Sequence, residues 1–101
     1  MNFSHGEIDL LVEAPDKKTI VVVEVKAAEV ATDTPPAASR PRPEVHVNHV
    51  KQRKLVSLAA QAVKRYRLHN RPVRFDVVGV DLPEKKKPVI RHHVGAFESH
   101  V

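Results

Sequence analysis

The sequence predicts a single α/β domain built on a mixed β-sheet. Two segments with strand patterning flank a Pro-Asp turn, an amphipathic helix follows, and two further strands come after the helix. A helix placed between a hairpin and a third strand returns the chain, so the third strand lies parallel to the hairpin. With 101 residues, the chain has room for one hydrophobic core. We therefore treat residues 1–101 as one domain.

The hairpin is expected over residues 6–12 and 19–26. The first segment alternates polar and apolar residues at its start, and the second is rich in β-branched residues. Pro15 and Asp16 between them favour a tight turn, because proline presets φ and aspartate can accept hydrogen bonds from nearby backbone amides. In the antiparallel register that sorts the residues best, one face is entirely apolar, with Ile8 opposite Val25, Leu10 opposite Val23 and Val12 opposite Val21.

The other face of the same hairpin gathers charged residues. It places Asp9 opposite Glu24, and Glu7 opposite Lys26. Opposed Cβ atoms lie roughly 5 Å apart, so two carboxylates repel each other there unless a cation or a proton intervenes. Oxygen ligands suit Mg²⁺ or Mn²⁺, which binds one or two carboxylates and completes its shell with water and substrate phosphate. The pattern therefore indicates a site for phosphodiester cleavage.

Each group in this site has a chemical role. The metal, bound by Asp9 and Glu24, would polarise a phosphoryl oxygen and lower the pKa of a bound water, and Lys26 would orient that water or stabilise developing charge. Glu7 is either a further metal ligand or the cross-strand partner of Lys26. The simpler alternative is that these charges form the solvated face of an amphipathic hairpin.

A helix is expected from an N-cap at Asn48 to about Leu68. Apolar residues at three- and four-residue spacings predict its buried side, namely Leu55, Leu58, Ala59, Ala62 and Tyr66. Basic residues give it a cationic outer flank, with Arg53, Lys54, Lys64, Arg65 and Arg67. Lys51 projects on the inward flank, where it either reaches the cleft or lies along the surface. Lys51, Arg53, Lys54, Lys64 and Arg65 are the candidate nucleic-acid-binding residues.

The remaining chain predicts two strands and one irregular loop. Residues 73–80 and 88–94 have strand composition, and the turn between them carries Pro83 and three consecutive lysines. Residues 28–45 contain four prolines among small and polar residues, which excludes a helix or a central strand. Long loops of this kind are either disordered or act as a flap over a substrate.

Composition favours an anionic partner. Lys and Arg number 17 against 12 Asp and Glu, a formal charge of +5, which makes nucleic acid the leading candidate. With only four aromatic residues, stacking on single strands is disfavoured, so we expect backbone and shape recognition of double-stranded or branched DNA. The absence of cysteine excludes thiolate zinc sites and fits a cytoplasmic location, and no segment has the length of an apolar membrane span.

Several short motifs resemble one protein family. Residues 6–11 (GEIDLL) and 22–26 (VVEVK) resemble the GEIDLI and VFVEVK motifs of the YraN-like predicted endonucleases. Residues 51–55 (KQRKL), 74–78 (RFDVV) and 93–97 (HVGAF) resemble that family's basic helix, RFDVV strand and HxxxAF ending. The family is regarded as a branch of the PD-(D/E)XK, restriction endonuclease-like superfamily, similar to Holliday junction resolvases. The resemblance implies a restriction endonuclease-like sheet with Asp9, Glu24 and Lys26 as catalytic residues.

The sequence departs from the family pattern in three places. Family members normally have an N-terminal helix with a glutamate and a first strand before GEIDLI, whereas this chain begins almost at the motif. The expected explanations are a shortened gene product, a misassigned start, or a homodimer that covers the exposed sheet. Ala27 and Ala28 also stand near a position where relatives carry an arginine, and the Pro-rich segment is longer than expected.

These observations leave three hypotheses for function. The first is a Mg²⁺- or Mn²⁺-dependent endonuclease acting on DNA, including branched or recombination intermediates. The second is a catalytically weak nucleic-acid-binding protein of the same fold. The third is a truncated remnant that folds only with a partner or with a second copy of itself.

Overall fold

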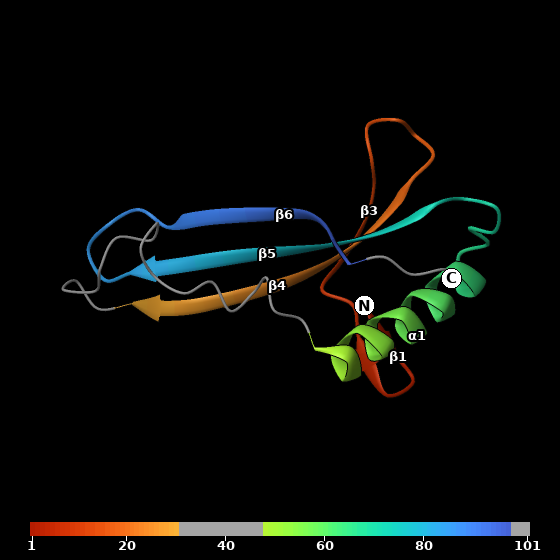
Figure 1. Cartoon of the computed structure of the whole chain (residues 1–101), viewed down its shortest axis with the longest axis horizontal. Coiled ribbons are helices and arrows are strands. Elements are labelled where there is room, and N and C mark those ends of the chain that lie inside the picture. The colour runs from red at the N-terminus through yellow and green to blue at the C-terminus, as the bar shows by residue number, and fades with distance from the viewer. Residues whose placement is uncertain (31–47, 98–101) are drawn as a thin grey trace.

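A sheet with the strand order β3-β4-β5-β6 is the framework of the computed structural model, which describes residues 1–30 and 48–97. Its strands are β3 (Leu10–Glu13), β4 (Ile20–Val30), β5 (Val73–Pro83) and β6 (Val89–Phe97). A separate two-stranded sheet pairs β1 (Asn2–Phe3) with β2 (Gly6–Glu7), and α1 (His49–Arg65) connects β4 to β5. The pair β4–β5 is parallel, and the other pairs are antiparallel (Figure 1). The mixed α/β sheet with a crossover helix is confirmed, and it is consistent with a restriction endonuclease-like fold.

Residues 6–12 do not form the single strand that their alternation predicts. Gly6 and Glu7 pair with β1, and the chain bends at Asp9 before β3 begins. The break follows from the environment of Ile8, whose backbone exchanges two hydrogen bonds with Met1 and whose side chain is fully buried. Ile8 therefore belongs to the β1–β2 unit rather than to the hairpin ladder.

The predicted register is correct over β3 and wrong beyond it. Leu10 lies opposite Val23, as expected, and the ladder continues in that register to the end of β3. Three predicted pairs are absent from the ladder because the backbone leaves it before Leu10: Ile8 with Val25, Asp9 with Glu24, and Glu7 with Lys26. The Ile8 side chain consequently lies on the face of the sheet opposite the predicted apolar face.

The main core lies between the sheet and α1. It contains Phe3, Ile8, Val22, Leu55, Leu58, Ala59, Ala62 and Phe75. Asn48 caps the helix as predicted, since its side-chain oxygen accepts a hydrogen bond of 2.9 Å from the Lys51 amide. The predicted burial of Tyr66 is wrong, because the helix ends at Arg65 and the Tyr66 side chain remains 46% exposed.

The opposite face of the sheet is only partly covered. Val21 and Val23 are buried there against Ala14, but Leu10 is 50% exposed and Ile90 is 66% exposed. In the described part of the chain, the helix lies on the other face. Part of this apolar surface is therefore open to solvent, and the homodimer stays a prediction that light scattering would test.

The long strands extend beyond the predicted boundaries. β4 continues to Val30 and pairs with β5 up to Pro83, so the residues at the start of the predicted loop are in a strand. The rest of that loop falls outside the described residues. Figure 1 shows that β4, β5 and β6 run well past α1. The aromatic rings of Phe75 and Phe97 stack with centroids 4.7 Å apart, which fixes the far end of β6 against β5.

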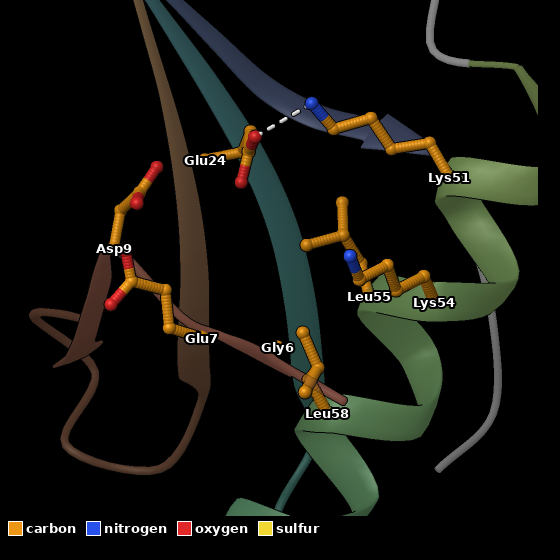
Figure 2. A pocket seen from close by; sticks show the side chains of 8 residues that line it. All are labelled: Gly6, Glu7, Asp9, Glu24, Lys51, Lys54, Leu55 and Leu58. Atoms are coloured by element: carbon orange, nitrogen blue, oxygen red, sulfur yellow. Dashed lines mark ion pairs between the residues drawn. The ribbon is translucent and has the colours of Figure 1, made fainter. Parts of the chain in front are cut away.

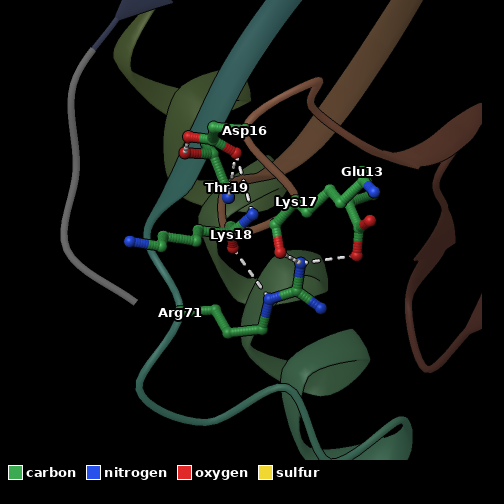
Figure 3. Close-up of polar contacts among 6 residues, drawn as sticks. All are labelled: Glu13, Asp16, Lys17, Lys18, Thr19 and Arg71. Carbon is green, nitrogen blue, oxygen red and sulfur yellow. Dashed lines mark hydrogen bonds and ion pairs between the residues drawn. The ribbon is translucent and has the colours of Figure 1, made fainter.

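The turn between β3 and β4 is organised by Asp16, as its Pro-Asp chemistry predicts. Its Oδ1 atom accepts hydrogen bonds from the backbone amides of Thr19 and Lys18, and its Oδ2 atom accepts one from the Thr19 hydroxyl (Figure 3). Arg71 then joins this turn to the segment after α1 by donating to the Lys18 carbonyl and the Glu13 carboxylate. Arg71 therefore ties both the turn and the end of β3 to the segment that precedes β5.

These bonds predict a specific response of the turn to acid. The backbone amides of Thr19 and Lys18, with the Thr19 hydroxyl, lower the pKa of Asp16 to about 2. Because this value lies below that of the unfolded chain, the turn contributes stability above pH of about 4, and this contribution is lost as the pH falls toward 2. A carboxyl-carbon NMR titration should give a midpoint near 2 for Asp16. An ordinary midpoint near 4 would show that these hydrogen bonds do not persist in solution.

Within residues 1–30 and 48–97, no helix is long and apolar enough to cross a membrane.

Candidate active site

A pocket forms where β2, the bend before β3, the middle of β4 and the first turns of α1 meet. Its lining combines carboxylates, lysines and apolar side chains: Gly6, Glu7, Asp9, Glu24, Lys51, Lys54, Leu55 and Leu58 (Figure 2). The predicted ligands Asp9 and Glu24 thus lie in the same pocket although the ladder does not pair them. The pocket also collects lysines that come from the helix rather than from the hairpin.

The Asp9 carboxylate is held by the backbone of the neighbouring strand. Its Oδ2 atom accepts a hydrogen bond of 2.8 Å from the Val25 amide. The β3–β4 ladder stops at Val23, so at Val25 the aspartate side chain takes the place that a β3 carbonyl would have occupied. This bond fixes the orientation of the carboxylate and places it beside the residue that follows Glu24.

Glu24 projects from the face of β4 that α1 covers. Its side chain is 15% exposed, and its Oε1 atom lies 2.8 Å from the Nζ atom of Lys51. Figure 2 shows the two side chains extending toward each other from the strand and from the first turn of the helix. Of the two expectations for Lys51, the structure supports the one in which this lysine reaches the cleft.

Lys26 and Glu7 take different positions from those predicted. Lys26 lies two residues after Glu24 and therefore on the same face of β4, opposite Gly79 of β5, but the described residues that line the pocket do not include it. Glu7 lines the pocket with an exposed side chain, and it pairs with Asn2 rather than with Lys26. The Glu7–Lys26 cross-strand pairing is therefore wrong.

Lys54 belongs to the pocket rather than to an outer flank of the helix. It lies one turn after Lys51, and its Cε atom would be 3.0 Å from a Cβ added to Gly6. The added Cβ would also lie 3.3 Å from Leu58 Cδ1, so glycine at position 6 allows β2 to pack this closely on α1. The three-residue spacing of Lys51 and Lys54 was the available signal for their common orientation.

The other candidate basic residues of α1 do not line the pocket. Arg53 and Lys64 are exposed. Arg65 has its guanidinium carbon 4.1 Å from the centre of the Phe3 ring and donates a hydrogen bond to the Asn2 carbonyl. Arg65 thus joins the end of the helix to β1, which gives it a structural role alongside any contact with nucleic acid.

The acidic side chains of the pocket suit a hard divalent cation that binds only a few protein ligands. The acidic side chains in the pocket, Glu7, Asp9 and Glu24, offer only oxygen ligands. Among the described residues, no three His, Cys, Asp or Glu side chains lie close enough to form a ready cation site. Mg²⁺ and Mn²⁺ are compatible with one or two carboxylates because water and substrate phosphate fill the remaining positions. Asp9 and Glu24 are the residues that would hold such an ion.

Another acidic group, Asp76, is buried away from the pocket. Its carboxylate accepts hydrogen bonds from the Arg74 guanidinium and the Gly95 amide, and it bonds His92 at 2.7 Å. Burial alone would raise the pKa of Asp76, but these donors outweigh it and the pKa is lowered. The network explains why arginine and aspartate flank Phe75 in the RFDVV segment: they anchor β6 at its bulge.

Adjacent histidines on β6 do not form a metal site. His92 bonds to Asp76, and His93 pairs in register with Val77. Consecutive strand residues point to opposite faces of the sheet, so the two imidazoles are separated by the backbone.

The fold and the pocket define an α/β domain, consistent with a restriction endonuclease-like fold, in which two carboxylates share a pocket with lysines of the crossover helix. The sequence model of UPF0102, described as an uncharacterised protein family, matches residues 1–80. The chain belongs to this family, which is the YraN-like group indicated by its motifs.

Curated relatives support the same assignment. A UPF0102 protein of Pelobacter propionicus is 33% identical over 92% of this chain and 61% of the relative, and one of Geotalea uraniireducens is 38% identical over 92% and 66%. A UPF0102 protein of Clostridioides difficile is 34% identical over 91% of this chain and 70% of its own length. The chain thus spans less than two thirds of the first two relatives.

Proposed function

We propose that this protein is a divalent-metal-dependent endonuclease that hydrolyses phosphodiester bonds of DNA. The observation that carries the proposal is the convergence of Asp9 and Glu24 in one pocket with Lys51 and Lys54. Carboxylates that bind a hard cation and lysines that attract phosphate are the groups that hydrolysis of a phosphodiester requires. The family resemblance, which implies Asp9, Glu24 and Lys26 as catalytic residues, supports the same chemistry.

The chain's own residues divide the work. When bound, Mg²⁺ or Mn²⁺ would polarise a phosphoryl oxygen and lower the pKa of a water molecule. Asp9 is oriented by the Val25 amide, and Glu24 is fixed on a central strand, so both carboxylates are positioned before the substrate arrives. Lys26 extends from the same face of β4 as Glu24, from where its ammonium would orient the attacking water or stabilise charge on the phosphate.

Double-stranded or branched DNA is the substrate class that this surface favours. The chain carries a formal charge of +5, and the consecutive lysines 85–87 between β5 and β6 are exposed. A stacking platform for bases needs several accessible aromatic rings, but Phe75 is 1% exposed, Phe97 stacks on it and Phe3 is covered by Arg65, which leaves Tyr66 at 46% exposure. Contacts to the phosphate backbone therefore dominate the proposed binding mode, and the similarity to resolvases favours branched substrates.

Two observations favour the second candidate, a nucleic-acid-binding protein with weak or no catalysis. In the part of the chain that the structure describes, no three metal-ligating side chains gather, and Glu24 is paired with a lysine. Such a protein would still use the lysines of the pocket and of the β5–β6 turn to hold DNA. The two candidates differ only in whether a metal ion converts binding into cleavage.

A cleavage assay separates these candidates. Purified protein is incubated with plasmid, flap, fork and four-way-junction DNA in Mg²⁺, Mn²⁺ or EDTA. Products that form with metal, not with EDTA, and not with an Asp9→Asn protein purified in parallel support the endonuclease. Retention of DNA in gel-shift experiments without any metal-dependent product supports the binding protein and contradicts the endonuclease.

A further inference from the structure

The Lys51–Glu24 ion pair places an ammonium where the proposed metal ion would bind. Lys51 Nζ lies 2.8 Å from Glu24 Oε1 inside the pocket that also contains Asp9. A cation at that distance neutralises Glu24, which would otherwise face Asp9 with a second negative charge. The protein thus carries an internal cation in contact with one of the two proposed metal ligands.

The position of Lys51 in the helix is not favoured by helix chemistry. Its amide is the one that Asn48 caps, which places the lysine in the first turn of α1. That turn contains no acidic residue, and a positive charge there is opposed by the helix dipole. The attraction of Glu24 across the pocket, rather than the stability of the helix, accounts for a lysine at this position.

The two partners differ in their ability to move. The Glu24 side chain is 15% exposed on a central strand, whereas the Lys51 side chain is 37% exposed at the end of the helix. A partly exposed ion pair is easily exchanged because water replaces either partner at small cost. Lys51 can therefore leave Glu24 and stay at the mouth of the pocket, while Glu24 remains in place.

We propose that Lys51 is an exchangeable counter-ion of the metal site. It neutralises Glu24 in the metal-free protein, is displaced when a divalent cation binds Asp9 and Glu24, and then contacts a phosphate of the bound DNA. This inference rests on the proposed function and adds a coupling to it: the metal releases the lysine that DNA requires, so metal and DNA bind cooperatively. By linkage, each ligand raises the affinity for the other by the same factor.

Metal affinity without DNA tests the exchange directly. Titration of the full chain with Mn²⁺, followed by calorimetry or by the EPR signal of unbound Mn²⁺, compares the wild type with Lys51→Ala. We expect the variant to bind Mn²⁺ about two- to fivefold more tightly, the range expected for loss of a partly exposed competing ion pair. Lys54→Ala is the matched control, because it removes the same charge from the same pocket without removing the ion pair.

The coupling is tested with DNA in a Lys26→Ala background, in which cutting is expected to be lost. Fluorescence anisotropy of a labelled duplex measures affinity with and without Mn²⁺. Mn²⁺ should strengthen duplex binding in this background, and adding Lys51→Ala should remove most of that gain. A gain that is unchanged by Lys51→Ala would overturn the coupling. Circular dichroism of each variant verifies that the helix is retained.

The outcomes distinguish this inference from the proposed function. Equal Mn²⁺ affinity in wild type and Lys51→Ala, or an equal increase in Lys54→Ala, overturns the exchange even if the wild type cuts DNA. An increase confined to Lys51→Ala supports the exchange even if no cleavage occurs, in which case the endonuclease alone fails. If neither the wild type nor Lys51→Ala binds Mn²⁺, the exchange is overturned.

Discussion

Asp9→Asn and Glu24→Gln are each expected to lower metal-dependent DNA cleavage by at least about a hundredfold, since each removes one of two carboxylates from the proposed cation site. The asparagine oxygen can still accept the hydrogen bond from the Val25 amide, so Asp9→Asn should keep its fold. Lys26→Ala should reduce cleavage to a similar extent while leaving Mn²⁺ binding intact. Single-turnover cleavage of the best DNA substrate measures all three.

DNA affinity provides the control for these variants. Binding measured in EDTA should change little in Asp9→Asn, and it should not weaken in Glu24→Gln, because loss of the ion pair leaves Lys51 available to phosphate. Glu84→Gln, an exposed acid in the β5–β6 turn, should cleave like the wild type. Full cleavage by Asp9→Asn, or an equal loss of activity in Glu84→Gln, would sink the assignment of the pocket as the active site.

Asp76→Ala is expected to lower the free energy of unfolding by about 3 kcal/mol, as when one partner of a buried, hydrogen-bonded ion pair is removed. The carboxylate is 1% exposed, and its loss leaves the Arg74 guanidinium and the Gly95 amide without their acceptor. Arg74 is 34% exposed and His92 is 50% exposed, so both can turn toward water. The expected loss of stability is therefore about 3 kcal/mol rather than the larger loss seen when both partners are fully buried. Urea denaturation followed by circular dichroism measures the change.

Glu84→Ala is the reference for this experiment, because an exposed acidic side chain in a turn should change stability by no more than about 0.5 kcal/mol. The Asp76 network should also fail in acid. Its lowered pKa means that it stabilises the fold above pH of about 4 and loses this contribution as the pH falls further. A decrease below about 1 kcal/mol for Asp76→Ala would show that the carboxylate does not anchor β6.

Local patterns accounted for much of the fold. The alternation at the start of residues 6–12 and the β-branched run of β4 predicted the correct pairing of Leu10 with Val23, because a one-residue slip would expose the buried side chains. The Asn48 cap and the spacing of the buried residues gave the helix, and the helix gave the parallel pair β4–β5. In each case the information lies within a few neighbouring residues.

These local patterns do not predict the break in the strand at Ile8. Residues 6–12 alternate well enough to extend the strand, but long-range contacts decide otherwise, since Ile8 bonds to Met1 and packs under the helix. Asp9 reaches the site by a side-chain bond to Val25 instead of by ladder pairing. The same limit applies to Tyr66, whose spacing fits the buried stripe although the helix has already ended.

The sequence by itself determined the family, the α/β class and the choice of Asp9, Glu24 and Lys26 as candidate residues, because these depend on residue types in short, ordered motifs. Only the tertiary structure decided which of them share a pocket. It placed Asp9 and Glu24 with Lys51 and left Lys26 farther along β4. The reason is physical: a carboxylate's neighbours are set by how a helix packs on a sheet, and side chains from distant segments meet there only after the core has formed.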